Sequence, residues 1–261
     1  MKTSKKMTIA ISLGSFIPLM GWINTYSGSC ISLIFPFISV CVICVGVMEL
    51  SVKKRECLAR SYFVEGTFLY KFFNSRQLVF IKSLFLSILL GMSLALSLIT
   101  WDSGIMYLLF GDIFLLSWIY SKTLSTLTGT IKENVKFVIA KDLAVSINSF
   151  FLLILLLLTQ FTTPIPEYVD ASLQTTLTSA LTVFSSECAV TNFLLMLNAQ
   201  KDAFSWWTML NIDSHIHDQK LRYITWLAFL LTNGLATYAF SRYTLQLLDL
   251  VRVFGDKNAQ Q

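Results

Sequence analysis

Two acidic side chains lie inside segments that are otherwise apolar, and they are the first candidates for chemistry. Asp112 follows eight residues of the apolar stretch 104–120, which places it about 12 Å along a helix. Glu187 stands at the centre of 173–198, a segment rich in Ser and Thr. A carboxylate inside a membrane is costly and is a functional candidate by default, so we predict both as residues of a transport pathway. For Asp112 the alternative is a structural hydrogen bond to Ser or Thr of a neighbouring helix.

Two shorter motifs are weaker candidates. Cys41 and Cys44 have the spacing of a redox pair, but their surroundings are apolar and carry no positive charge, which favours simple packing. The five cysteines of the chain lie mostly inside apolar segments and therefore predict no disulfide framework. His215 and His217 have no cysteine or further histidine nearby, so we expect no metal site there.

The sequence contains no pattern of its own for catalysis. Both histidines fall in one loop, and no general base stands near a placed nucleophile. No glycine is followed by lysine, so the phosphate-binding pattern G-x-x-x-x-G-K-[ST] is absent. We therefore expect neither enzymatic activity nor a cofactor, and any use of ATP would need a separate protein.

The composition is that of an integral membrane protein. The chain is 55% hydrophobic and 13% charged, against about 25% charged for a typical soluble domain. Uninterrupted runs such as 150–158, which reads FFLLILLLL, could not all be buried in a globule of this size. The net charge of +5 follows from membrane topology and needs no nucleic-acid partner.

Apolar segments of membrane-spanning length organise the whole chain, which we expect to be one all-α membrane domain over residues 1–261. Three lysines precede the first segment, as in a signal peptide, but no small-residue cleavage site follows. We therefore take it as a span with its amino terminus in the cytoplasm, in a plasma or inner membrane. The six predicted spans cover about residues 7–23, 30–50, 79–100, 104–120, 138–160 and 223–245.

The interval 173–207 allows two interpretations. A full crossing at 173–198 would place Glu187 at mid-depth, where an acid costs about 2.5–3.5 kcal/mol. A re-entrant helical hairpin in the outer leaflet would avoid that cost and hold Trp206 and Trp207 at headgroup level. Counting basic residues on each side does not separate the two. We favour the hairpin, because of Glu187 and the Ser and Thr content.

The longest polar interval between the predicted spans is also strongly basic. Residues 53–82 hold seven of the twenty basic side chains, and apolar residues recur on one helical face. We predict an amphipathic helix over 53–73 that lies on the cytoplasmic membrane surface. Such an interval also serves as a topology signal and lipid anchor. A break at Gly66 into two short segments is a further alternative, because glycine disfavours a helix interior.

The order of these elements resembles the permease subunit of type-2 ABC exporters. Those permeases often carry Glu-x-Gly-Thr-hydrophobic, then Pro-x-Ser-Arg, then a lysine that opens the third span. The residues that carry the resemblance here are Glu65-Gly66-Thr67-Phe68, with no residue between Glu65 and Gly66, then Asn74-Ser75-Arg76-Gln77 and Lys82. Asn74 departs from the family's proline. The likeness in order covers most of the chain, whereas the motif covers about thirty residues.

The resemblance implies a function and its partners. The chain would be the membrane subunit of an ATP-driven exporter, and a separate ATP-binding subunit would press on the surface helix. A second permease copy or a relative would complete the path through the lipid. The residues that would couple the chain to the ATPase are Arg55, Arg60, Glu65, Gly66, Lys71 and Arg76. The alternative is a pore-forming, sensor or immunity protein of the membrane that acts without an ATPase.

Overall fold

The computed structural model describes residues 5–64, 66–73, 75–162, 164–183, 185–215 and 218–258, and these residues form helices and connections without a β-strand. Six long helices build the body of the molecule, and three shorter or peripheral helices lie at its two ends. The elements are α1 (Lys5–Thr25), η1 (Cys30–Leu33), α2 (Ile34–Tyr62), α3 (Phe68–Phe73), α4 (Arg76–Thr100), α5 (Ser103–Leu127), α6 (Glu133–Thr162), α7 (Leu173–Ala180), α8 (Ala189–His215) and α9 (Gln219–Asn258).

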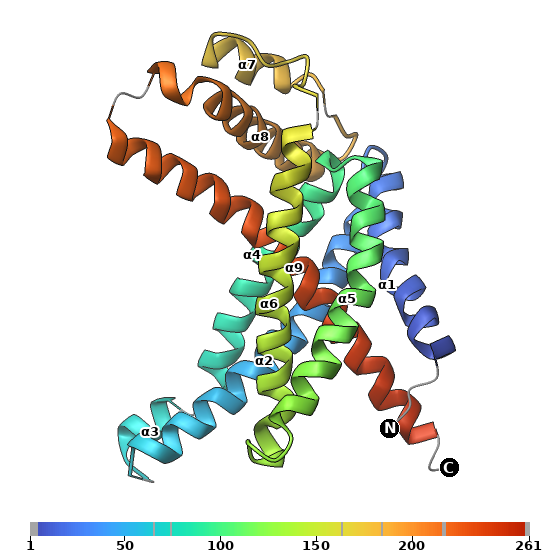
Figure 1. The fold of residues 1–261 in the computed structure, drawn as a ribbon, viewed down its shortest axis with the longest axis vertical. Helices are drawn as coiled ribbons and strands as arrows, with labels where there is room; N and C mark the ends of the chain where they lie inside the picture. The colour runs from blue at the N-terminus through green and yellow to red at the C-terminus, as the bar shows by residue number, and fades with distance from the viewer. Residues whose placement is uncertain are drawn as a thin grey trace.

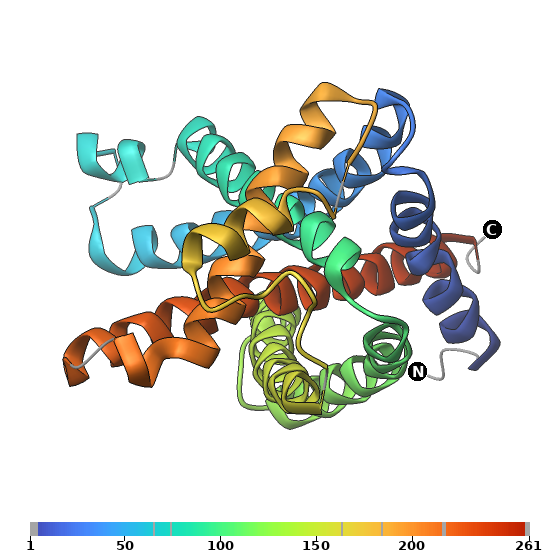
Figure 2. The same ribbon diagram turned by 90° about the horizontal axis from the view of Figure 1, so that it is seen from above.

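The long helices form an elongated bundle with two different ends (Figure 1). One end carries α3, the α5–α6 connection and both chain termini, and we call it the basic end because it bears Lys71, Arg76, Lys122 and Lys132. The other end is covered by α7 and α8. Seen from above, α9 passes between the α5–α6 pair and the α2–α4 pair (Figure 2).

Four stretches of the described residues are long and apolar enough to cross a membrane. They are Cys30–Ala59, Phe68–Thr100, Ser103–Leu127 and Val135–Thr159, which correspond in the main to α2, α4, α5 and α6. The protein is therefore all-helical in its described part and has the make-up of a membrane protein. Each of the six predicted spans falls within one long helix, except that the second begins in η1.

The core of the bundle lies where α2, α4 and α9 meet. Gly91 on α4 sits against the backbone of α2: a Cβ atom there would lie 3.2 Å from the Cα of Val40. Trp22 of α1 donates its indole N–H to the backbone carbonyl of Ala95, at 2.7 Å. Phe240 and Tyr243 of α9 are fully buried in the same cluster. Close backbone approach thus joins α4 to α2, and buried aromatic rings hold α9 in the centre of the bundle.

The prediction of one amphipathic helix over 53–73 is wrong. Helix α2 continues from the bundle to Tyr62, and only the six residues Phe68–Phe73 form the separate helix α3. The reason is Gly66, whose φ of +90° belongs to a left-handed turn that residues with a Cβ rarely adopt. The alternative of a break at this glycine is therefore the one that the structure bears out.

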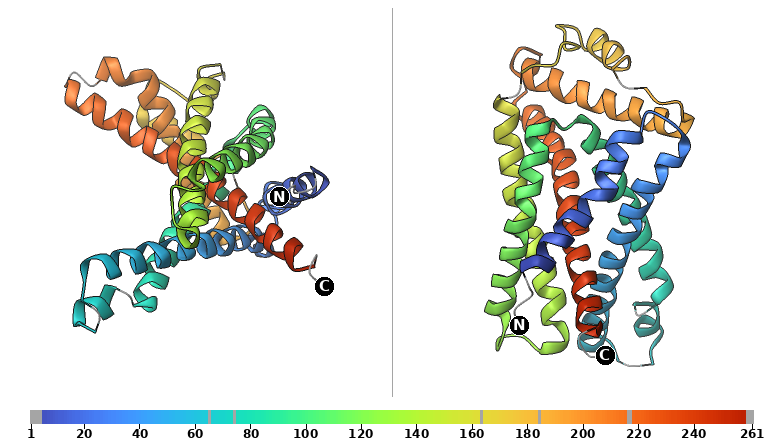
Figure 3. Two further views of the ribbon diagram at one scale, coloured as in Figure 1. Left: turned by 60° about the horizontal axis from the view of Figure 1, so that its bottom comes forward. Right: turned by 90° about the vertical axis from the view of Figure 1, so that its right-hand side faces the viewer.

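The interval after α6 is not one continuous helix over 173–198. Helix α7 ends at Ala180, and α8 begins at Ala189. Helix α8 lies across the end of the bundle, with α7 beyond it (Figure 3). We call residues 164–183 and 185–215 the cap. Ala180 of α7 packs against Ala199 and Ala203 of α8, and these small side chains let the two helices approach closely.

A disulfide joins the cap to the bundle, and this corrects the expectation that the cysteines form none. Cys30, in η1 just before α2, is bonded to Cys188, just before α8. Both lie at the cap end, at the edges of their helices rather than inside apolar spans. The same contact is reinforced by Ser186, whose hydroxyl donates to the Tyr26 carbonyl at 2.7 Å, and by the Glu187 N–H, which donates to the Ser27 carbonyl at 3.0 Å.

Candidate functional site: a polar seam inside the bundle

A line of polar side chains runs through the otherwise apolar bundle, and it is the strongest candidate site in the described part of the chain. It starts near the basic end and reaches about half the length of the long helices. We call it the polar seam. Its members are Glu49 of α2, Asp112 of α5, Lys141, Asp142 and Asn148 of α6, and Ser241, Arg242, Gln246 and Asp249 of α9.

Helical spacing explains how α6 and α9 supply most of the seam. Lys141 and Asn148 are seven residues apart, close to two full turns, so they share one face of α6. On α9, Arg242, Gln246 and Asp249 follow each other at intervals of four and three residues, again one face. The two faces meet because α6 and α9 pack side by side.

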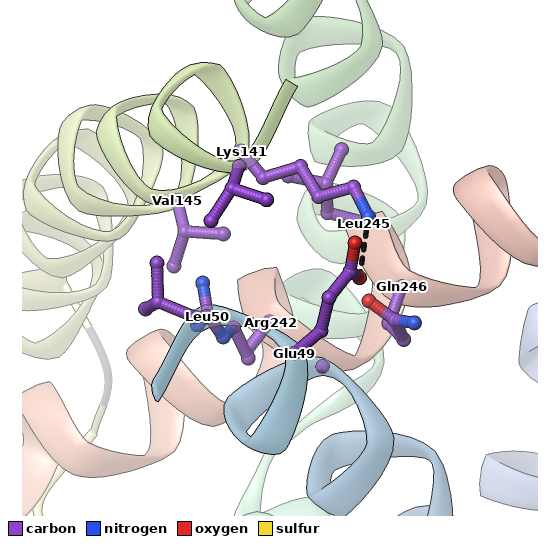
Figure 4. Close-up of a pocket in the computed structure, with 9 residues that line it drawn as sticks. Glu49, Leu50, Lys141, Val145, Arg242, Leu245 and Gln246 are labelled. Carbon is purple, nitrogen blue, oxygen red and sulfur yellow. Dashed lines mark hydrogen bonds and ion pairs between the residues drawn. The ribbon is translucent and has the colours of Figure 1, made fainter. Parts of the chain in front are cut away.

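Lys141 is the centre of the lower part of the seam. Its ammonium group donates to Glu49 Oε2 at 2.9 Å and to Asp249 Oδ2 at 2.6 Å, which ties α6 to both α2 and α9. Figure 4 shows the lysine reaching across to Glu49. The Lys141 side chain is only 9% exposed. A buried charge persists only when it is paired, and Lys141 is paired twice.

Asp142, the next residue on α6, holds a second set of charges. It accepts from Lys54 of α2 at 2.7 Å and from Arg242 of α9 at 3.5 Å. The Arg242 side chain is 5% exposed, whereas that of Lys54 is 55% exposed and lies toward solvent. With Lys54 counted, three cations and three carboxylates thus balance across α2, α6 and α9, so the lower part of the seam adds no net charge to the bundle.

A small cavity lies between these charged groups. Its volume of about 10 Å³ is close to what one water molecule needs by the same measure. Its polar lining comes from Glu49, Lys141, Arg242 and Gln246 (Figure 4). Gly46 also lines this cavity, and a Cβ at that position would lie only 2.8 Å from Gln246 Oε1. Glycine at position 46 therefore lets α9 place a polar side chain against α2.

The upper part of the seam joins α5, α6 and α9 without a cation. Asn148 donates its Nδ2 hydrogens to Asp112 Oδ2 at 2.8 Å and to Ser241 Oγ at 3.1 Å. Asp112 is 4% exposed and Asn148 is fully buried. The intramembrane acid predicted from sequence thus has both an amide and a serine beside it, which the sequence alone did not pair with it.

The second predicted pathway residue is placed elsewhere. Glu187 is exposed in the connection between α7 and α8, next to the disulfide, and the structure does not bring it near Asp112. Sequence reasoning missed most of the seam, because Lys141, Asp142 and Arg242 lie within a few residues of the ends of the predicted spans 138–160 and 223–245, where charged side chains are common. One signal in the sequence could have revealed the seam. Glu49, Lys141 and Arg242 lie in three different predicted spans, each within a few residues of the span end predicted to face the cytoplasm.

The predicted coupling residues gather at a corner of the basic end. Helix α3 and the last turns of α2 extend away from the bundle there (Figure 1), and we call residues 55–64 and 66–73 the projecting corner. Arg55 is half-buried on α2, Lys71 is exposed on α3, and Arg76 is exposed at the start of α4. Arg60 lies on α2, and Glu65 falls outside the described residues.

Large apolar side chains of the projecting corner face outward. Phe68 is 80% exposed, Tyr62 is 78% exposed, and Leu69 and Phe72 are about half exposed. Phe68 and Phe72 stack on each other on one face of α3. This surface combines exposed apolar groups with basic ones, which suits either a lipid headgroup region or the groove of a partner protein.

An apolar groove of about 570 Å³ runs between α2 and α4 on the outside of the bundle. Cys41 and Cys44 line it as free cysteines, together with Phe37, Met48 and Phe80. The pair is therefore placed on an apolar surface rather than in a polar redox site. Its surroundings agree with the packing interpretation of the Cys-x-x-Cys spacing.

Within the cap, a partly buried acid holds the 164–172 segment against α8. The Tyr168 hydroxyl donates to Asp202 Oδ2 at 2.9 Å. Burial raises the pKa of Asp202, and the Tyr168 hydrogen bond and the neighbouring Lys201 oppose that rise in part. Burial and the Asp202 charge together raise the pKa of Tyr168, so its hydroxyl keeps its proton.

Within the described residues, no three His, Cys, Asp or Glu side chains converge in a way that could hold a metal ion. No family model, curated protein or solved structure matches the chain.

Proposed function

We propose that this chain is the membrane-spanning permease subunit of an ATP-driven exporter and that a separate subunit hydrolyses the ATP. The observation that carries the proposal is the projecting corner. It presents Phe68, Leu69 and Phe72 next to Lys71 at the basic end, where a soluble partner could hold it. The order of elements supports the same interpretation, because two long helices precede the corner, four follow it, and the cap stands before the last of these four.

Helix α2 offers a mechanical connection from the corner to the cap. It is continuous over Ile34–Tyr62, about 43 Å at 1.5 Å per residue. The carboxyl-terminal end of α2 enters the projecting corner. Glu49, in the middle of the helix, accepts from Lys141, and Cys30, just before the amino-terminal end, is bonded to Cys188 of the cap. In the proposed mechanism, closure of the ATPase moves the projecting corner, and α2 transmits that movement to the cap. The cap acts as the outer gate.

The proposed topology has six spans, with the basic end in the cytoplasm of a cell bounded by a plasma or inner membrane. Lysines and arginines gather at the basic end, as the positive-inside rule requires of cytoplasmic loops. The Cys30–Cys188 disulfide at the opposite end suits an oxidising compartment. The cap would then rest in the outer headgroup region, with α8 as the longer arm of the re-entrant hairpin. A second permease copy or a relative would complete the path.

The test is co-purification of an ATPase in mild detergent. We expect the wild-type chain to bring ATP-hydrolysing activity with it, and we expect Lys71→Glu with Arg76→Glu to lose that activity. The matched control is Lys122→Glu with Lys132→Glu, which reverses two exposed charges elsewhere on the basic end and should retain the activity.

Two outcomes would count against the proposal. If the Lys71 and Arg76 variant retains the full ATPase activity, the projecting corner is not the coupling surface. If the isolated chain in pure lipid conducts or signals without nucleotide or a second protein, it belongs to the pore-forming, sensor or immunity class instead.

A further inference from the structure

Two buried oxygen atoms in the upper part of the polar seam lack a hydrogen-bond donor. Asp112 Oδ1 and Asn148 Oδ1 have no partner in the described part of the chain, although neither atom is accessible to solvent. Both atoms are acceptors. They belong to side chains already joined by the hydrogen bond from Asn148 Nδ2 to Asp112 Oδ2, at 2.8 Å. Leaving a buried acceptor unpaired costs about 1–3 kcal/mol, and more for a charged group.

The neighbouring side chains do not supply the missing donor. Both hydrogens of Asn148 Nδ2 are used, one on Asp112 and one on Ser241. The cavity of the seam is lined by neither Asp112 nor Asn148, so water held there does not lie against them. The charged or titratable side chains nearest to this pair along α6 and α9 are Lys141, Asp142, Tyr238, Arg242, Tyr243 and Asp249.

Neither cation of the seam pairs with Asp112. Lys141 is bonded to Glu49 and Asp249, and Arg242 to Asp142. An ionised Asp112 would therefore be a buried carboxylate with no counter-charge, in a helix with the length and composition of a membrane span.

We propose that Asp112 is a proton-binding site, with the proton on Oδ1 and donated to Asn148 Oδ1. A carboxylic acid and a carboxamide can form two parallel hydrogen bonds, N–H to C=O and O–H to C=O. The first of these bonds is present in the structure, and the bound proton supplies the second. One proton thus satisfies both orphan acceptors and removes the uncompensated charge, without any additional atom that would need space.

Polar groups extend from this site toward the basic end. Ser241 is followed on α9 by Arg242, which donates to Asp142, and Asp142 also accepts from Lys54, whose side chain is 55% exposed. Binding converts the Asp112 carboxylate to a neutral acid with a proton taken from solvent, and release restores the carboxylate. The contact of α5 with α6 and α9 then depends on protonation, whether or not the chain has an ATPase partner.

Infrared spectroscopy of the purified full-length protein tests this assignment. At neutral pH we expect the C=O stretching band of a protonated carboxyl group, shifted in D2O because its proton is exchangeable. Asp112→Asn should remove the band. The control is Asp102→Asn on the same helix, where the exposed Asp102 caps α5 by accepting from the Ile105 N–H, and it should keep the band. A wild-type spectrum without the band, or a band whose intensity Asp112→Asn leaves unchanged, would overturn the proposal.

Thermal unfolding across pH gives a second readout that does not need the spectrum. Because the folded state favours the protonated form, the contribution of this site is present at low pH and is lost as pH rises through proton release. Wild type should lose stability toward alkaline pH, and Asp112→Asn, which stays neutral, should lose less. If added Na⁺ at alkaline pH raises the unfolding temperature of wild type but not of Asp112→Asn, the site holds a metal cation and the proton assignment is wrong.

Discussion

Charged side chains inside this helical bundle are stabilised only where single partner residues are placed to pair with them. Lys141 is the clearest case, since its ammonium group meets one carboxylate from α2 and one from α9. Replacing a whole buried ion network with apolar groups is often neutral, whereas removing one partner leaves charges unpaired. The stability of the polar seam is therefore expected to fall when one charged side chain is removed. It should fall less when a cation and its carboxylate partners are removed together.

Lys141→Met should destabilise the protein strongly. It leaves Asp249 without its cation and Glu49 with only the more distant Lys53, and we expect a loss of about 3 kcal/mol, at the lower end of the range for a broken buried pair because Glu49 remains partly exposed. The measurement is thermal or denaturant unfolding in detergent.

A lysine four residues beyond Glu49 provides the control. Lys53 pairs with Glu49 at 3.8 Å and is itself 39% exposed, so Lys53→Met should change stability by less than about 1 kcal/mol. Equal effects of the two substitutions would show that Lys141 is not the centre of the seam. Adding Glu49→Gln and Asp249→Asn to Lys141→Met should recover part of the loss, because the two carboxylates that lost the Lys141 cation are then neutral and only the exposed Lys53 lacks its partner.

At the scale of elements, the contact between α2 and α4 depends on a missing side chain. Gly91 lies so close to α2 that a Cβ would meet the Val40 backbone, at 3.2 Å from Cα and 3.3 Å from N. Backbone atoms cannot rotate away as a side chain can. The helices would have to separate, and the loss of packing would extend along both.

Gly91→Ala should therefore cost about 1–3 kcal/mol, the usual range for an overpacked core. The same substitution at Gly111 on α5 is the matched control, since nothing lies within 4 Å of the position a Cβ would take. There alanine should be neutral or stabilising by up to about 1 kcal/mol, because it is the better helix former. Unfolding of the two variants under one condition compares them, and a stabilised Gly91→Ala protein would contradict the close approach.

At the scale of the whole molecule, the two ends differ in redox chemistry as well as in charge. The cap end holds the Cys30–Cys188 disulfide, and the basic end holds Cys57, which is free and exposed on α2. A protein with this arrangement in a membrane would place the disulfide on the oxidising side. Cysteine reactivity can therefore report its orientation directly.

With Cys41 and Cys44 replaced by serine, Cys57 is the one described cysteine that is still free to react. We expect a membrane-impermeant maleimide to label it in inverted membrane vesicles but not in intact cells. Replacing Cys57 by serine as well should abolish the signal. Labelling in intact cells would place the basic end outside, which is the reverse of the proposed topology.

The sequence determined the class of the protein and the positions of its long helices. Long apolar runs such as 150–158 leave few alternatives to a helix in a membrane, because every backbone polar group there needs a partner within its own segment. Asp112 also stood out from sequence alone as an acid within such a run. These features are local, and local composition is sufficient to reveal them.

Only the tertiary structure decided how distant segments pair. Cys30 and Cys188 are 158 residues apart, and Lys141 meets Asp249 across 108 residues, so their contacts depend on how each helix is rotated and how far it is shifted along its neighbours. The break at Gly66 likewise required a backbone angle that composition does not specify. Hydrophobic periodicity fixes which face of a helix is buried, but it does not say which buried face lies opposite, and the polar seam exists only in that arrangement.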